Sequence, residues 1–296
     1  MTRLPQIAFL ADGRRLHLQD GPIDLIIEAK GRAADVRAAY GAAARRFTGL
    51  LDELCAELPD LRKAAHPLHC PLQGVVARRM YAAVAPFAAD CFITPMAAVA
   101  GSVAEEILGA MLAAARLDRA YVNNGGDIAL HLSRDEQFTV GLMDRLDRDG
   151  VMRTMVIDAR DPARGIATSG RHGRSFSLGI ADAVTVLARS ASQADAAATI
   201  IANAVDLHGH PAIRRCPANS LQPDSDLGPR LVTREVGALS PTEIATALDA
   251  GRACARQWLG AGLIEAAALR LSGEAMIVEM KDVQRHSNAL RERAVA

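Results

Sequence analysis

The stretch AYVNNGGDIALHL, residues 120–132, decides the fold class, because it places two strand-like runs on either side of a tight turn. A Gly-Gly pair between such runs is typical of an antiparallel hairpin. Further strand-like runs occur at residues 7–10, 16–18, 23–28, 138–143, 152–157, 183–188, 231–236, 264–271 and 276–279. The pattern predicts antiparallel sheets.

Helical periodicity separates these groups of strands, at residues 33–57, 75–84, 96–117, 193–205 and 241–259. Strands grouped beside helices, without regular alternation, indicate an α+β fold. Residues 207–230 are rich in Pro, His, Asn and Asp and predict a long loop that crosses a neighbouring element. We expect a single domain over residues 1–296, with two intertwined α+β halves as the alternative, and a charged tail at residues 286–296.

Composition excludes several classes of protein. Basic and acidic residues both number 34, so the formal charge is zero, and only six Phe, three Tyr and one Trp are present. A neutral chain with few aromatic rings does not fit a nucleic-acid partner. The longest uncharged stretch, residues 91–104, is too short to span a membrane. Five scattered cysteines without a C-x-x-C pair favour a reducing, cytoplasmic location.

Three segments carry residues suited to chemistry, and the first is the hairpin turn itself. Gly125 and Gly126 have no Cβ atoms, so a flat ligand or a phosphate can approach the main chain. Asn124 and Asp127 flank them as polar groups. A plain Asn-Gly hairpin accounts for the same residues, and both interpretations stay open.

The second segment, residues 165–175, reads GIATSGRHGRS. Hydroxyls, permissive glycines and guanidinium groups together are suited to holding a phosphate or diphosphate. The alternative is an exposed polar loop. The candidate residues are Thr168, Ser169, Gly170, Arg171, Arg174 and Ser175.

The third segment lies on the helix expected at residues 193–205. Asp195 and Thr199 are four residues apart, so their oxygens lie on one side of that helix. A carboxylate and a hydroxyl suit a hard cation such as Mg²⁺. Alternatively, Ser192 is the N-cap and Asp195 only favours the first turn of its own helix.

In this order, the three segments resemble the ApbE superfamily, whose characterised members are Mg²⁺-dependent transferases that move FMN from FAD onto a protein Ser or Thr. Residues 122–127 are similar to the family's Gly-Gly-Asp turn, residues 167–170 to its Thr-Ser-Gly segment, and residues 194–199 to its A-D-x-x-x-T helix. The resemblance covers residues 97–205. The overall pattern is more similar to an uncharacterised cytoplasmic branch, bacterial and archaeal, than to the transferases.

The resemblance implies a T-fold-related arrangement of antiparallel sheets with packed helices. It implies Mg²⁺ held by Asp195, Thr199 and the backbone carbonyl of Ala97. It also implies FAD, or another flavin or nucleotide diphosphate, along the first two segments, and a protein acceptor for the FMN group. The alanine-rich helices would permit a homodimer.

Two departures from the family pattern bear on catalysis. The family segment D-x-x-x-I-A-K-G aligns with residues 94–101, where Thr94 replaces the acid and Ala100 replaces the lysine. The histidine of H-x-I-D-P-x-T-G is missing from residues 175–182, which read SFSLGIAD. One hypothesis is therefore an enzyme that transfers or cleaves across the diphosphate. The second is a binding or carrier protein that has lost transferase activity, and a third is an enzyme acting on another small anion.

Overall fold

The computed structural model describes residues 4–145 and 148–279, so the expected charged tail lies outside the described residues. The strands are β1 (Gln6–Phe9), β2 (Leu16–Asp20), β3 (Ile23–Lys30), β4 (Arg119–Asn124), β5 (Asp127–Leu132), β6 (Gln137–Arg145), β7 (Arg148–Asp158), β8 (Gly165–Ser169), β9 (Ala183–Ala188), β10 (Ile213–Pro217), β11 (Leu231–Val236), β12 (Ala266–Leu271) and β13 (Glu274–Glu279). The helices are α1 (Ala33–Phe47), α2 (Leu50–Ala56), α3 (Leu58–Leu61), α4 (Val75–Val84), α5 (Val99–Ala114), α6 (Ala191–Ala204), α7 (Ala218–Leu221) and α8 (Pro241–Gly260), with short 3-10 turns η1 (Ala85–Phe87) and η2 (Pro95–Ala98).

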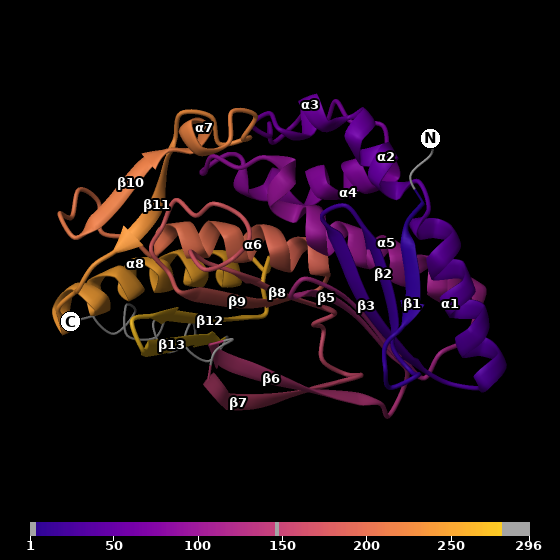
Figure 1. Ribbon diagram of the computed structural model, residues 1–296. Coiled ribbons are helices and arrows are strands. Elements are labelled where there is room, and N and C mark those ends of the chain that lie inside the picture. Colours follow the sequence, from indigo (N-terminus) through magenta and orange to yellow (C-terminus); the bar gives the residue numbers. More distant parts are fainter. Residues whose placement is uncertain (1–3, 146–147, 280–296) are drawn as a thin grey trace, which may run out of the picture.

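A nine-stranded sheet organises the described chain, in the order β1-β2-β3-β4-β5-β8-β9-β12-β13. Every neighbouring pair in it is antiparallel. The long helices cover one face, and the β6–β7 hairpin lies beyond the other (Figure 1). The α+β class with antiparallel sheets is therefore confirmed.

The strand register assigns each side chain of β4 and β5 to one of these faces. Ala120, Val122 and Ala129 belong to the large core under the helices. Tyr121 and Ile128, one residue out of phase with them, pack in the smaller core beneath the β6–β7 hairpin. Residues of β4 and β5 that are two apart therefore face the same layer.

Small residues let α5 and α6 lie unusually close to each other and to the sheet. A Cβ atom on Gly101 would lie 2.2 Å from the carbonyl oxygen of Ala191, and one on Gly165 would lie 2.1 Å from the carbonyl of Ser190. Most alanines of α6, including Ala194 and Ala197, are buried inside the chain, whereas Ala113 and Ala114 at the end of α5 are exposed. The homodimer stays a prediction.

Two sequence predictions differ from the structure. The helix expected over residues 33–57 breaks at Gly49, whose φ of 83° ends α1 and starts α2. The loop expected over residues 207–230 contains β10 and α7, and β10 pairs with β11 in a separate two-stranded sheet. We refer to residues 207–236 as the arm.

The segment Pro95–Ala114 is long and apolar enough to cross a membrane by length and composition alone. It comprises η2 and α5, and it packs against α1, α4 and α6. Ile107 and Met111 within it are fully buried. In this fold the segment is the central helix of the helical layer.

Candidate functional site

The β4–β5 turn has a backbone shape that favours glycine. Gly125 and Gly126 have φ values of 66° and 113°, and Asn123 Oδ1 accepts a hydrogen bond of 2.8 Å from the Gly126 N–H. The hairpin is therefore confirmed, and the ligand-binding interpretation of the same residues stays a prediction. A Cβ atom on Gly125 would lie 2.1 Å from Nη2 of Arg174, the end of an exposed side chain that can move aside, so it is the left-handed backbone conformation that favours glycine here. The turn thus brings an exposed guanidinium against a bare stretch of backbone.

Asp127 begins β5 and lies on the helix-facing side of the sheet, two residues before Ala129. Its Oδ1 accepts the backbone N–H of Thr168 at 3.2 Å. Burial raises the pKa of Asp127 to about 7, although the Thr168 hydrogen bond and the charge of Arg174 act in the opposite direction. This carboxyl is therefore protonated over part of the neutral range when no cation is bound.

Asp195 lies on α6 and reaches the beginning of α5. Its Oδ2 accepts the Gly101 N–H at 3.0 Å. Burial raises the pKa of Asp195 well above its usual value, and the next largest cause is the negative charge of Asp127. The two carboxyls therefore lie close enough for their charges to interact, and Asn124 donates to the Ala100 carbonyl at 3.2 Å beside the start of α5. We call this group of residues the Asp127–Asp195 recess.

The N-cap of α6 is Ser190, whose hydroxyl accepts the Gln193 N–H at 3.3 Å. The alternative in which Ser192 caps the helix is therefore wrong, and Asp195 lies beyond the first three helical residues. The Ser192 N–H instead donates to Glu105 Oε1 of α5 at 2.6 Å. Each helix thus receives an acid from the other at its N-terminal end, and Asp195 is not needed by its own helix.

The remaining candidate metal donors lie on neighbouring elements. Thr199 follows Asp195 by one turn on α6, and both residues are partly exposed. Ala97 lies in η2, which packs against α6. The recess is therefore bordered by η2, the start of α5, one side of α6 and the β4–β5 turn.

The end of β8 presents different groups to the two faces of the sheet. The Thr168 hydroxyl pairs with the Thr185 hydroxyl at 2.9 Å, on the face away from the helices, while its N–H points to Asp127. Ser169 lies on the helix-facing side. Gly170 follows, where a Cβ atom would lie 2.5 Å from the Asp182 carbonyl oxygen. The backbone and Ser169, rather than the Thr168 hydroxyl, face the recess.

The two candidate arginines have different surroundings. Arg171 donates to Asp182 Oδ1 from Nε at 2.9 Å and from Nη2 at 2.6 Å, and His172 contacts the same oxygen at 3.3 Å. Arg174 is exposed and donates to the Pro22 carbonyl at 3.2 Å. Ser175 beside it is also exposed. Arg174 is thus the guanidinium that remains available at the turn.

Comparisons with known proteins identify a family for this chain. A family model described as "AbpE bacteria" matches residues 7–277. The chain belongs to this family. The UPF0280 protein of Methanocella arvoryzae is 38% identical over 163 residues, 54% of this chain and 63% of that protein. The UPF0280 protein MK0206 of Methanopyrus kandleri is 38% identical over 156 residues, 52% of this chain and 59% of that protein. Each of these two matches thus spans less than two thirds of the relative's length.

A solved structure has a similar outline at low sequence identity. It is the apo form of the flavinyl transferase ApbE of Pseudomonas stutzeri, with a TM-score of 0.49 and 13% identity. The match covers 93% of this chain and 94% of that chain.

This member of the AbpE bacteria family has an acid near the recess that the sequence did not reveal. The Thr94 hydroxyl, just before η2, donates to Asp226 Oδ2 at 2.5 Å. Asp226 belongs to the arm, which also forms an ion pair of 2.7 Å between Asp224 and Arg62. Thr94 stands where the resemblance places an acid, so the arm brings a carboxylate to that position from a distant part of the chain.

Proposed function

We propose that this member of the AbpE bacteria family binds a flavin nucleotide, FAD, together with Mg²⁺ at the Asp127–Asp195 recess. The observation that carries the proposal is the pair of carboxyls held in one recess by the backbone N–H groups of Thr168 and Gly101. Each is destabilised by burial, and Asp195 also by the charge of Asp127. A bound cation would relieve both effects.

The donor set fits a hard cation. In this proposal Asp195, the Thr199 hydroxyl and the Ala97 carbonyl hold Mg²⁺, and Asp127 supplies a second carboxylate beside them. Oxygen donors of this kind suit Mg²⁺, which completes its shell with water and ligand phosphates. The ion would supply charge neutralisation and Lewis acidity at the diphosphate.

The surrounding residues have complementary tasks in this proposal. Gly126 leaves the main chain open to the ligand, and Arg174, whose guanidinium lies over Gly125, offers an exposed cation to a phosphate. Ser169 and Gly170 continue this lining at the end of β8. Arg171 donates to Asp182 and thereby positions residues 170–175. Its Nε and Nη2 atoms are used in this ion pair, so in this proposal they do not contact the diphosphate. The flavin ring would rest on glycine backbone and aliphatic side chains.

A binding or carrier role, without transfer, is the second candidate, and specific observations favour it. Ala100 stands in place of the family's lysine, and the family's histidine is missing from residues 175–182. In the enzymatic alternative, FMN passes to a hydroxyl of a protein acceptor or to water, and AMP leaves. In either case we place the protein in the cytoplasm.

Binding and turnover assays with purified protein and FAD distinguish the binding role from the enzymatic role. Flavin fluorescence, titrated with and without Mg²⁺, measures binding, and chromatography measures released AMP and FMN. Asp195→Asn removes the metal ligand's charge, and Asp249→Asn on the exposed side of α8 is the matched control. Mg²⁺-dependent binding that Asp195→Asn abolishes supports the proposal, and AMP release decides for the enzyme. Failure of FAD to bind at any Mg²⁺ concentration refutes it.

A further inference from the structure

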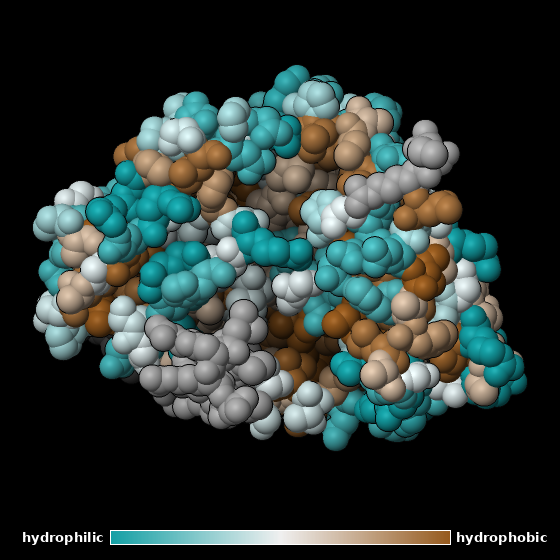
Figure 2. All heavy atoms as spheres, in the orientation of Figure 1, coloured by the Kyte–Doolittle hydropathy of each residue, from teal (hydrophilic) through white to brown (hydrophobic). Residues whose placement is uncertain are grey.

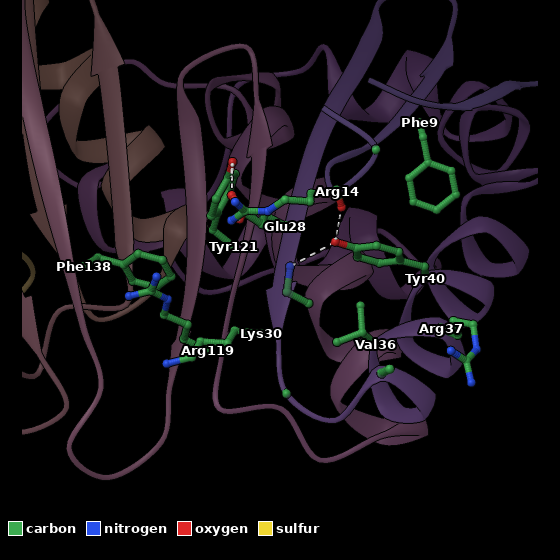
Figure 3. Close-up of a pocket in the computed structure, with 14 residues that line it drawn as sticks. Phe9, Arg14, Glu28, Lys30, Val36, Arg37, Tyr40, Arg119, Tyr121 and Phe138 are labelled. Carbon is green, nitrogen blue, oxygen red and sulfur yellow. Dashed lines mark hydrogen bonds and ion pairs between the residues drawn. The ribbon is translucent and has the colours of Figure 1, made fainter. Parts of the chain in front are cut away.

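A cavity of about 480 Å³ opens at the edge of β3, away from the Asp127–Asp195 recess. Its walls come from β1, β3, α1, β4 and β6 (Figure 3). Cavities of this volume are typical of small-molecule sites. Arg119 and Tyr121 line it near the start of β4, whereas the Gly125–Gly126 turn follows the end of that strand. Tyr121 also faces the opposite side of the sheet from Asn124, so the two sites are distinct.

Aromatic rings are concentrated in this cavity. Phe9 and Tyr40 lie on one side of β3 with ring centroids 5.9 Å apart, and Tyr121 and Phe138 lie on the other side at 6.1 Å (Figure 3). The whole chain has only six Phe, three Tyr and one Trp. Such a concentration in a chain poor in aromatic residues offers flat faces to a planar ring.

The Tyr40 ring is held in place by its hydroxyl. That hydroxyl accepts the Ala29 N–H at 3.1 Å and donates to the Arg14 carbonyl at 2.8 Å. The pairing of β2 with β3 ends at Leu16 and Ile27, so β2 does not pair with Ala29. The Tyr40 hydroxyl accepts the Ala29 N–H in its place. The cavity wall is thus fixed before any ligand arrives, which lowers the entropic cost of binding.

Positive charge exceeds negative charge around the cavity. Arg14, Lys30, Arg37 and Arg119 line it, against Glu28 as the acid among the lining residues. Arg14 pairs with Glu28 at 2.6 Å. Lys30 and Arg119 share the neighbouring Glu136, at 2.6 and 3.6 Å. After these pairings a net positive charge remains, although the chain as a whole is neutral.

The N-terminal end of α1 also borders the cavity. Gly31 and Ala33 line it, and the N-cap residue Arg32 makes no side-chain capping hydrogen bond. Asp35 in the first turn pairs with Arg32 at 2.5 Å and offsets part of the positive charge there. The first N–H groups of a helix attract anions. On the surface, apolar and hydrophilic residues are intermixed around the β1 edge (Figure 2), where Ile7 and Phe9 are exposed.

We infer that this cavity binds a planar aromatic anion. Arg119 already lies over the Phe138 ring, 5.4 Å from its centroid, so the ligand ring packs against the Phe9–Tyr40 pair. The carboxylate or phosphate lies toward Arg37 and the start of α1. This inference is independent of the proposed function, because it uses none of the recess residues.

Isothermal titration calorimetry with 2-naphthoate tests the inference, with 2-naphthamide as the uncharged match. The variants Phe9→Ala and Arg37→Glu change exposed side chains, so folding is preserved. Arg252→Glu on α8 is the control for surface charge, and Asp195→Asn is the control for the other site. We expect one naphthoate per chain. We also expect affinity to fall by on the order of tenfold in Arg37→Glu and about fivefold in Phe9→Ala.

The expected pattern also requires 2-naphthamide to bind at least about tenfold more weakly, and both control variants to bind naphthoate like the unmodified protein. Equal affinity for the two compounds would mean an apolar patch only and would overturn the inference. So would loss of naphthoate binding in Asp195→Asn, absence of binding at millimolar naphthoate, or a dimer that Phe9→Ala dissociates. Loss of FAD binding with naphthoate binding intact refutes the proposed function alone.

Discussion

Replacing Gly101 by Ala should push α5 and α6 apart. The added Cβ atom would lie 2.2 Å from the Ala191 oxygen, 2.5 Å from its carbonyl carbon and 2.8 Å from the Ser192 nitrogen. All three atoms belong to the backbone, so no side-chain rotation relieves the overlap. Overpacking of this kind costs about 1–3 kcal/mol, and the higher helix propensity of Ala returns only about 1 kcal/mol. The separation also draws Gly101 away from Asp195.

Gly109→Ala is the matched control, because Gly109 lies on the same helix and a Cβ atom there meets nothing within 4 Å. It should gain up to about 1 kcal/mol from helix propensity. Urea unfolding followed by circular dichroism compares the two variants with the unmodified protein. Gly101→Ala should be the least stable of the three and should bind Mg²⁺ most weakly. If Gly101→Ala is as stable as Gly109→Ala, the two helices are not in the close contact described.

Three further outcomes are expected. Mg²⁺ at one hundred times its Kd should raise the free energy of unfolding by about 2.7 kcal/mol. Thermal unfolding of the unmodified protein and of Asp195→Asn, each with and without Mg²⁺, checks this. An equal rise in the unfolding temperature of both proteins would contradict the metal assignment. In EDTA, stability should fall as the pH rises from 4 to 7, because burial raises the pKa of Asp127 from 3.8 in the unfolded chain to about 7 in the folded one. Asp127→Asn should flatten this profile in urea titrations, and an unchanged slope would disprove the cause. Asp226→Ala should free the arm, so that limited proteolysis cuts within residues 218–230 faster than in the unmodified protein; unchanged cleavage would show that this contact does not hold the arm.

Local signals in the sequence predicted where helices and strands form better than they predicted how these elements pack together. The Gly125–Gly126 hairpin and the helix beginning at residue 241 were predicted correctly. The turn of the hairpin, and the Ser240–Glu243 capping box at the start of the helix, each involve residues close together in sequence. The N-cap of α6 was misplaced, since Ser190 and Ser192 are equally suitable caps and packing against Glu105 decides between them. Such a choice is set by tertiary contact and leaves no local signal.

The candidate site was predicted in part for the same reason. Asp195 and Thr199 share a helix side, which spacing alone reveals. The partnership of Asp127 with Asp195 depends on β5 lying beside β8 and on α6 packing over both strands. Asp226 depends on the path of the arm, which joins residues 132 positions apart through Thr94. Residue spacing carries no information about either arrangement.

The exchange of acids between α5 and α6 explains how an unfavourable carboxyl pair persists. Glu105 satisfies the start of α6, so Asp195 is released from that task and can extend to Gly101. The N-terminal end of α5 offsets part of the charge of Asp195 but leaves its pKa well above the usual value. The fold therefore maintains an arrangement that costs stability, and a cost of this kind persists at functional sites when the surrounding packing over-determines it. The tight contact at Gly101 supplies that packing, and under the proposed function the relief of the carboxyl pair would become binding free energy for the cation.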